Sequence, residues 1–301
     1  MRHMQEINLK NAFNCRDLGG YQTRSGLMVQ PKQLIRSGYL SDLDNSDQQA
    51  LYNYGIRTII DFRSPLEVRK YPDHYDSRTQ YLKIPILKQD LTESMTNVRN
   101  LAGWLTDKWA GFHQMMRIYD QLIASDEVQR AYRQFFLTLV DANSGGILFH
   151  CSTGKDRTGI ISILILVMLG VPEEVVKADY LCSNWFSAVR INNRLNEAKL
   201  VSDNLAYLKS IFDLSTVRED YFQQAVSMIN DRYGSFDSYF HDRLGFDDAF
   251  LLRMRKKILS VNDIPFIPLI ILKVGQKVVL HSGMTSRFIF YDANMIVKPR
   301  T

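Results

Sequence analysis

The chain has 301 residues, of which 46% are hydrophobic and 23% are charged. This is the composition of an ordinary globular protein that can bury a sizeable core without disulfide staples. The net charge of +5 suits an anionic substrate, but it is too small to indicate nucleic-acid or membrane binding.

The cysteine content and the apolar runs bear on where the protein works. An odd, sparse set of three cysteines (Cys15, Cys151 and Cys182) argues against a disulfide framework and for a reducing compartment or a free reactive thiol. Residues 1–11 hold no apolar core of signal-peptide length, and the longest apolar run, residues 160–169, is too short to span a bilayer. We therefore expect a cytoplasmic protein with no stable membrane insertion.

The N-terminal residues 14–21 are dense in turn formers and charges, and Gly19-Gly20 supplies a chain reversal. Arg16 and Asp17 are interpreted as structural charges that tie the N-terminus to the core by a buried ion pair, because loop charges are more often structural than catalytic. Cys15 is interpreted as a plain buried thiol, with a protective disulfide to Cys151 as the alternative if the two lie close.

Three β-rich runs follow, at residues 32–39, 57–64 and 81–86. Ser46 and Gln49 have the spacing of a capping box, which predicts a short helix that ends near Gly55. Asp61 lies at the carboxyl end of the second predicted strand. In open α/β sheets that edge is where ligands bind.

Two helical stretches come next. Residues 90–125 are rich in Met, Trp and polar side chains and look helical but irregular. The stretch after them has apolar side chains at helical spacing, which predicts a helix with one face in the core. These side chains are Val128, Ala131, Tyr132, Phe135, Phe136, Leu139 and Val140.

The most informative stretch is residues 149–159, with a strand-length apolar run before it (146–150) and a helix-length run after it (160–169). A strand–loop–helix of this kind brings backbone N–H groups and the positive end of a helix dipole to one point. Gly154 lets the backbone curl closely around a ligand. The stretch therefore predicts an anion site.

Cys151 and Arg157 give that anion site its chemistry. Five residues separate them, about the span needed to loop around one phosphate. The surrounding N–H groups and cations should lower the pKa of the Cys151 thiol. A guanidinium at Arg157 can bind two phosphate oxygens at once. The loop therefore combines a nucleophile with an oxyanion clamp.

The pattern His150-Cys151-x5-Arg157-Thr158-Gly159 resembles the signature of the cysteine-based protein tyrosine phosphatases. Lys155-Asp156 before the arginine resembles the atypical bacterial branch of tyrosine and lipid phosphatases. Residues 14–21, 61–64 and 231–246 are also similar to segments of that branch, so the resemblance runs from about residue 14 to residue 259.

This resemblance implies a fold and a division of the chain. The fold is α/β, with a central, mostly parallel sheet of four or five strands flanked by helices. Residues 1–260 form the phosphatase domain. Within it, residues 90–125 are either a mobile helical lid over the active site, as in relatives, or an ordinary helical insertion. Residues 261–301 lie outside the resemblance, and their turn signals predict only a β-rich C-terminal extension.

The resemblance also implies hydrolysis of phosphotyrosine through a phosphocysteine on Cys151, with inorganic phosphate as product. Thr158 is expected to hydrogen-bond the sulfur, and His150 is expected to order the loop from behind. The residues expected to bind the substrate phosphate are Ser152, Thr153, Gly154, Lys155, Asp156 and Arg157.

A general acid must protonate the leaving group, and two carboxylates are candidates. Asp156 in the loop is narrowly preferred, with Asp61 as helper or alternative. Either could instead be a salt-bridge partner of Arg63 or Lys155. No cofactor is expected, and the six histidines lack metal-ligand spacing, so no metal site is predicted.

Two other functions compete with the phosphotyrosine phosphatase. A phosphoinositide phosphatase could use the same loop, because Lys155 suits a phosphate-rich inositol ring. A phosphate-binding module without turnover is the third possibility, and intact Cys151 and Arg157 argue against it. The expected partner is thus a phosphorylated protein or a phosphoinositide.

Overall fold

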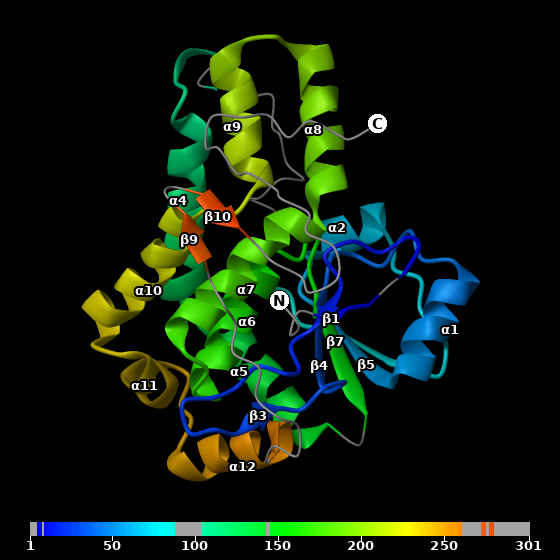
Figure 1. Cartoon of the computed structure of the whole chain (residues 1–301), viewed down its shortest axis with the longest axis vertical. Helices are drawn as coiled ribbons and strands as arrows, with labels where there is room; N and C mark the ends of the chain where they lie inside the picture. The colour runs from blue at the N-terminus through cyan, green and yellow to red at the C-terminus, as the bar shows by residue number, and fades with distance from the viewer. Residues whose placement is uncertain are drawn as a thin grey trace.

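A computed structural model of the chain describes residues 5–7, 9–87, 104–142 and 145–260, and two short strands at 272–274 and 277–279. Its main sheet has the strand order β1-β2-β4-β7-β5-β6 (Figure 1). Four strands run parallel, namely β4 (Leu34–Ser37), β7 (Gly146–His150), β5 (Ile56–Asp61) and β6 (Gln80–Lys83). The antiparallel edge is formed by β1 (Gln5–Glu6) and β2 (Arg16–Asp17). The predicted mostly parallel sheet is confirmed. The two-residue edge strands, too short to show a hydrophobic period, make it six-stranded.

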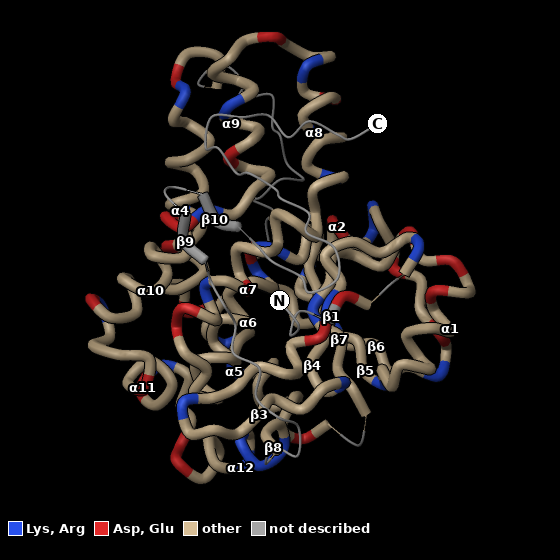
Figure 2. Tube along the Cα trace, viewed as in Figure 1, with Lys and Arg blue, Asp and Glu red and all other residues tan. Residues whose placement is uncertain are grey.

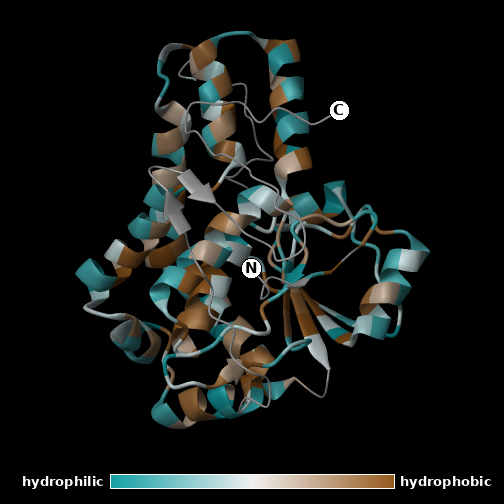
Figure 3. Ribbon diagram, viewed as in Figure 1, coloured by the Kyte–Doolittle hydropathy of each residue, from teal (hydrophilic) through white to brown (hydrophobic). Residues whose placement is uncertain are grey.

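Both faces of the sheet are covered, as parallel sheets require. Along β7, Ile147 and Phe149 belong to the larger core while Leu148 between them belongs to a smaller one, because successive strand side chains point to opposite faces. The smaller core lies against α1 (Asn45–Tyr54). Figure 1 shows α1 on one side of the sheet and the other large helices on the opposite side, and Figure 3 shows the hydrophobic strands between them.

The larger helical layer includes the predicted amphipathic helix, now α5 (Asp126–Asp141). Its predicted apolar face is buried from Val128 to Leu139, and Val140 packs half-buried beside it. The prediction of a core-facing helix is therefore confirmed. The same layer holds α6 (Arg157–Met168), α7 (Glu173–Phe186), α10 (Glu219–Tyr233) and α12 (Asp248–Ile258).

A group of three helices extends away from one end of the sheet (Figure 1). These are α4 (Ala110–Ala124), α8 (Ala188–Val201) and α9 (Leu205–Ser215). Part of the predicted lid falls on α4, whose residues Met115, Ile118 and Leu122 are buried. Residues 88–103 lie outside the described part of the chain. The lid function of residues 90–125 therefore stays a prediction.

The helix α1 ends at Gly55 as predicted, with φ 119. Its start was wrong by two residues, because the N-cap is Asp44 and not Ser46. The Asp44 carboxylate accepts the amide of Asp47 at 2.9 Å and the Ser46 hydroxyl at 2.6 Å. A charged oxygen outcompetes a hydroxyl at the positive end of a helix.

The remaining elements are short. They are α2 (Pro65–Lys70), α11 (Phe236–Ser238), η1 (Tyr239–Arg243), the pair β3 (Met28–Val29) with β8 (Leu259–Ser260), and the antiparallel hairpin of β9 (Leu272–Val274) and β10 (Lys277–Val279). The hairpin lies within residues 261–301, most of which lie outside the described residues, so the β-rich extension stays a prediction. Figure 2 shows basic and acidic residues interspersed over the helices in view. No described helix is both long and apolar enough to cross a bilayer.

Candidate active site

The signature loop joins the end of β7 to the start of α6, so the predicted strand–loop–helix is confirmed. Cys151 directly follows the strand and Arg157 is the first residue of the helix. Gly154 has φ +69, and a Cβ there would lie 2.4 Å from the carbonyl oxygen of Ser37. Only glycine fits that conformation and that gap. The loop can therefore curl as the anion site requires.

A buried ion cluster supports the loop from the side of the helices. Asp179 on α7 accepts Nε of Arg16 at 3.0 Å and Nη1 of Arg36 at 2.6 Å. Burial alone would raise the pKa of Asp179, but the two arginines lower it. Arg36 also donates Nη2 to the carbonyl of Gly154 at 2.8 Å. The cluster therefore fixes the backbone of the signature loop.

The buried ion pair expected from the N-terminal segment is present. Arg16 pairs with Asp179 of α7, across 163 residues of sequence, and so ties the N-terminus to the core. Asp17 instead accepts the amides of Gly19 at 2.7 Å and Lys32 at 2.5 Å. Adjacent strand residues point to opposite faces of a sheet, so Arg16 and Asp17 cannot meet.

Arg157 is held by Glu67 of α2 in a bidentate ion pair, with Nη1–Oε2 at 2.8 Å and Nη2–Oε1 at 2.6 Å. The hydroxyl of Ser152 donates to the same carboxylate. Burial would raise the pKa of Glu67, but the Arg157 charge and these hydrogen bonds lower it to about 2. Glu67 therefore orients both the Arg157 guanidinium and the Ser152 side chain.

Sequence reasoning missed Glu67. Its only local signal is the capping box with Ser64, in which Glu67 accepts the Ser64 amide at 2.8 Å. That motif predicts a helix start, but nothing in it indicates a contact with Arg157, 90 residues further along the chain.

Asp156 lies in the loop and is buried. Lys155 donates Nζ to Oδ2 of Asp156 at 2.8 Å, and Tyr119 of α4 donates its hydroxyl to Oδ1 at 2.9 Å. Lys155 is the residue whose positive charge would suit a phosphate-rich inositol ring. It is only 2% exposed, because its ammonium group turns inward to this carboxylate.

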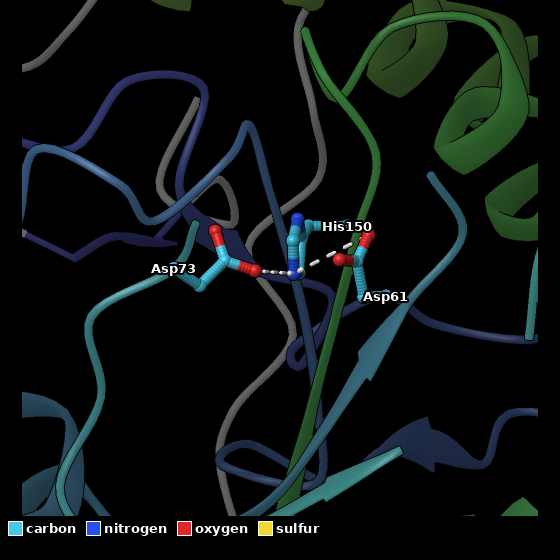
Figure 4. Close-up of side chains that lie close together, drawn as sticks. All are labelled: Asp61, Asp73 and His150. Carbon is cyan, nitrogen blue, oxygen red and sulfur yellow. Dashed lines mark ion pairs between the residues drawn. The ribbon is translucent and has the colours of Figure 1, made fainter. Parts of the chain in front are cut away.

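Figure 4 shows His150 between two carboxylates, with Nε2 at 3.1 Å from Asp73 and 3.9 Å from Asp61. Burial would lower the pKa of His150, but Asp73 and Asp61 raise it. Nδ1 of His150 lies 3.2 Å from the carbonyl of Cys151. These contacts support the expected role of His150 behind the loop.

The three residues in Figure 4 have a ligand atom each within 4.8 Å of one another, which a metal ion could bridge. The two carboxylates already have a cation, because Nη2 of Arg63 lies 2.9 Å from Asp61 and 2.5 Å from Asp73. The hydroxyl of Tyr81 also lies within hydrogen-bond distance of both, at 2.5 Å from Asp61 and 2.9 Å from Asp73. The group is thus a neutralised hydrogen-bond network, and a metal is not needed to explain it.

The sequence profile of the tyrosine phosphatase family matches residues 7–260. The chain belongs to the tyrosine phosphatase family. It is 30% identical over 242 residues to an inferred tyrosine-protein phosphatase of Cupriavidus necator, covering 79% of this chain and 84% of that protein. It is 29% identical over 281 residues to the triple specificity protein phosphatase PtpB of Mycobacterium tuberculosis, covering 84% and 98%. A tyrosine-protein phosphatase of Nostoc commune is 31% identical over 154 residues, covering 50% and 47%.

The prediction of a tyrosine phosphatase from the signature loop is therefore confirmed. In this tyrosine phosphatase Cys15 and Cys151 are both free thiols. The protective disulfide considered as the alternative for Cys15 is therefore not formed. Burial raises the pKa of Cys15 to about 12, which fits a plain buried thiol. The hydroxyl of Thr158 has no hydrogen-bond partner among the described residues, so its expected bond to the sulfur is not formed here.

A cavity of about 720 Å³ opens beside Ser152 and Thr153 of the phosphatase loop. Its lining includes Tyr39 and Tyr71, whose rings stack with centroids 5.6 Å apart. These aromatic residues come from segments far from the signature. Sequence reasoning did not find them, because a single tyrosine in a loop carries no signal of the cavity it lines.

Proposed function

We propose that the chain hydrolyses phosphotyrosine through a phosphocysteine intermediate on Cys151. The observation that carries this proposal is the single loop in which Cys151 directly follows β7 while Arg157 is held in place by Glu67. A nucleophile and an oriented guanidinium within one phosphate-sized loop are what phosphoryl transfer to sulfur requires.

In the first step, the Cys151 thiolate attacks phosphorus and the bond from phosphorus to the phenolic oxygen breaks. The amides of residues 152–157 and the Arg157 guanidinium bind the equatorial oxygens as charge spreads over them. Asp156 donates its proton to the departing phenolate oxygen.

In the second step, water attacks the phosphocysteine and inorganic phosphate leaves. Asp156, now a carboxylate, accepts the proton of the water molecule. Thr158 is assigned a hydrogen bond to the departing sulfur, which its buried and unpartnered hydroxyl could form by rotation, partners being considered among the described residues.

Asp61 is less suited than Asp156 to be the general acid. It is fully buried and accepts from Arg63 through two separate oxygens, at 3.0 and 2.9 Å. Both of its oxygens are occupied by Arg63, and Oδ2 also accepts the Tyr81 hydroxyl, so no oxygen is left to contact a leaving group. We assign it to orienting His150 together with Asp73.

A phosphoinositide is the alternative substrate, since the relative PtpB is named a triple specificity protein phosphatase and so acts on more than one substrate class. The inward pairing of Lys155 with Asp156 favours phosphotyrosine, because it leaves less free positive charge for a second ring phosphate. Parallel turnover of a phosphotyrosine peptide and of soluble phosphoinositides would separate the two substrates.

We further propose that residues 1–260 form the phosphatase domain and that residues 261–301 are an extension of it. The match of the family profile to residues 7–260 supports this division. A cytoplasmic location also belongs to the proposal.

The test compares the native protein with Cys151→Ser on an aryl phosphate and on a phosphotyrosine peptide. We expect the serine variant to lose activity by a factor on the order of 10⁴ or more, as removal of a catalytic nucleophile does. Mass spectrometry of acid-quenched native enzyme should find phosphate on the Cys151 peptide. Undiminished hydrolysis by the serine variant would overturn the proposal. An absence of hydrolysis by the native protein would also overturn it.

A further inference from the structure

Arg190 of α8 lies in a corner made by two aromatic rings. Its guanidinium carbon is 4.7 Å from the ring centroid of Phe13 and 4.9 Å from that of Tyr39. The two rings meet edge to face, with centroids 5.2 Å apart. Nη1 of Arg190 donates to the hydroxyl of Tyr39 at 3.0 Å. An arginine is always charged, so this corner holds a fixed cation.

The segments that carry Phe13 and Tyr39 are hydrogen-bonded to the signature loop. The amide of Tyr39 donates to the carbonyl of Ser152 at 3.2 Å. Asn14, which follows Phe13, donates Nδ2 to the carbonyl of Thr153 at 3.0 Å. Arg190 therefore stands one tyrosine side chain away from the loop that binds the phosphate, and all of these residues except Asn14 line the same cavity.

The charge of Arg190 is not neutralised by any carboxylate that the structure describes within ion-pair distance. Its Nε is buried and has no hydrogen-bond partner among the described residues. By contrast, Arg194, one turn further along α8, lies 3.7 Å from Glu197. The aromatic rings stabilise the cation only partly, so Arg190 is suited to bind an anion that enters the cavity.

We propose that Arg190 forms a second anion subsite, which binds an acidic side chain next to the phosphotyrosine of a peptide substrate. This proposal rests on the proposed function. Nη2 of Arg190 is not among the buried unpartnered atoms, and the guanidinium can use it to donate a charged hydrogen bond to a carboxylate. The cavity lining combines aromatic side chains, among them Tyr71, Trp185 and Phe186, with polar and charged ones. The aromatic part of this lining suits the side chains of a peptide better than the many hydroxyl groups of an inositol ring.

The test measures binding in the Cys151→Ser background, by calorimetry, so that turnover does not matter. Two phosphotyrosine peptides that differ only in one neighbouring residue, Glu or Gln, are compared. The parent should bind the Glu peptide more tightly, by a factor on the order of ten for a partly exposed charged hydrogen bond. Arg190→Gln should remove most of this preference, and Arg190→Lys should keep part of it.

The matched control is Lys199→Gln, which removes one positive charge from an exposed position of the same helix away from the cavity lining. It should keep the preference of the parent. If Arg190→Gln does not fold, Tyr39→Phe removes only the hydroxyl that holds Arg190 and should reduce the preference. Melting temperatures identify unfolded variants.

Equal binding of the two peptides by the parent would overturn the proposal. So would an equal loss for both peptides in Arg190→Gln, since that result would assign Arg190 a purely structural role. An Arg190-dependent preference for inositol bisphosphate over monophosphate, without a peptide preference, would also overturn it. Failure of the native protein to turn over either peptide would instead refute the proposed function, and the binding comparison would still decide the subsite.

Discussion

Glu67 illustrates how one residue can control a site without touching the reacting atoms. It binds Arg157 through both carboxylate oxygens and also accepts the hydroxyl of Ser152. Removal of its charge would leave a buried guanidinium without its counter-ion, and such unpaired buried charges are costly. The orientation of the clamp and the stability of the loop therefore depend on the same carboxylate.

Glu67→Gln should lower both stability and kcat/KM. The pKa of Glu67 falls from 4.5 to about 2 on folding, so its charge stabilises the native state above the unfolded pKa and ceases to do so as pH falls through the folded pKa. At pH 7 the loss should be on the order of 3 kcal/mol. Urea unfolding at pH 7, 4.5 and 3 measures it. A difference from the native protein that does not shrink toward pH 3 would contradict the assignment.

Asp156 and Asp61 can be ranked by mutation. For a phenyl phosphate with a poor leaving group, Asp156→Asn should lower kcat by about 10²- to 10⁴-fold, because no other group would protonate the phenolate. Asp61→Asn should affect the rate far less and stability more, since it loosens Arg63. A good leaving group should rescue Asp156→Asn. The opposite ranking would transfer the role of general acid to Asp61.

At the scale of elements, the signature works because β7, the loop and α6 have compatible local geometry. The strand is buried on both faces and the first turn of α6 is buried with it, so the loop cannot drift relative to the sheet. Gly154 is the point where this geometry is tightest, with positive φ and the backbone of Ser37 in contact.

Gly154→Ala should destabilise the protein and weaken phosphate binding. The new Cβ would meet the carbonyl oxygen of Ser37 at 2.4 Å, and backbone atoms cannot rotate out of the way. Gly26→Ala is the matched control, because Gly26 has φ +84 but nothing within 4 Å of its Cβ position. We expect a loss of about 1 kcal/mol for the control, from backbone strain alone, and a clearly larger loss at Gly154. Equal losses in denaturant titrations would show that the close contact is unimportant.

At the scale of the whole molecule, the buried cluster around Asp179 joins three parts of the chain. Arg16 comes from the N-terminal edge of the sheet, Arg36 from β4 and Asp179 from α7, and the hydroxyl of Tyr21 also donates to Asp179 at 3.0 Å. The cluster contacts the signature loop through the hydrogen bond from Arg36 to the carbonyl of Gly154. It therefore couples the assembly of the domain to the shape of the active site.

Asp179→Ala should destabilise the protein by about 3–5 kcal/mol, because two arginines would stay buried without their carboxylate. Asp220→Ala provides the comparison, since Asp220 pairs with Arg218 at 3.0 Å but is half exposed. That exposed pair should be worth no more than about 1 kcal/mol. Thermal and chemical unfolding of the two variants would test the difference. Comparable small losses in both would refute a structural role for the cluster.

The amino-acid sequence by itself determined the nucleophile loop, the strand before it and the helix after it, because all the residues involved are consecutive and their spacing carries the chemistry. It likewise determined the core face of α5 through its helical period. It left the partners of Arg16 and Asp61 open, since a charged residue in a loop does not reveal its partner.

The tertiary structure alone decided those partners. Arg157 meets Glu67 across 90 residues, Arg190 meets Tyr39 across 151, and Arg16 meets Asp179 across 163. Such pairs have no period or local motif in the sequence. They form only when packing of the sheet and helices brings buried charges together, and burial then makes a partner necessary.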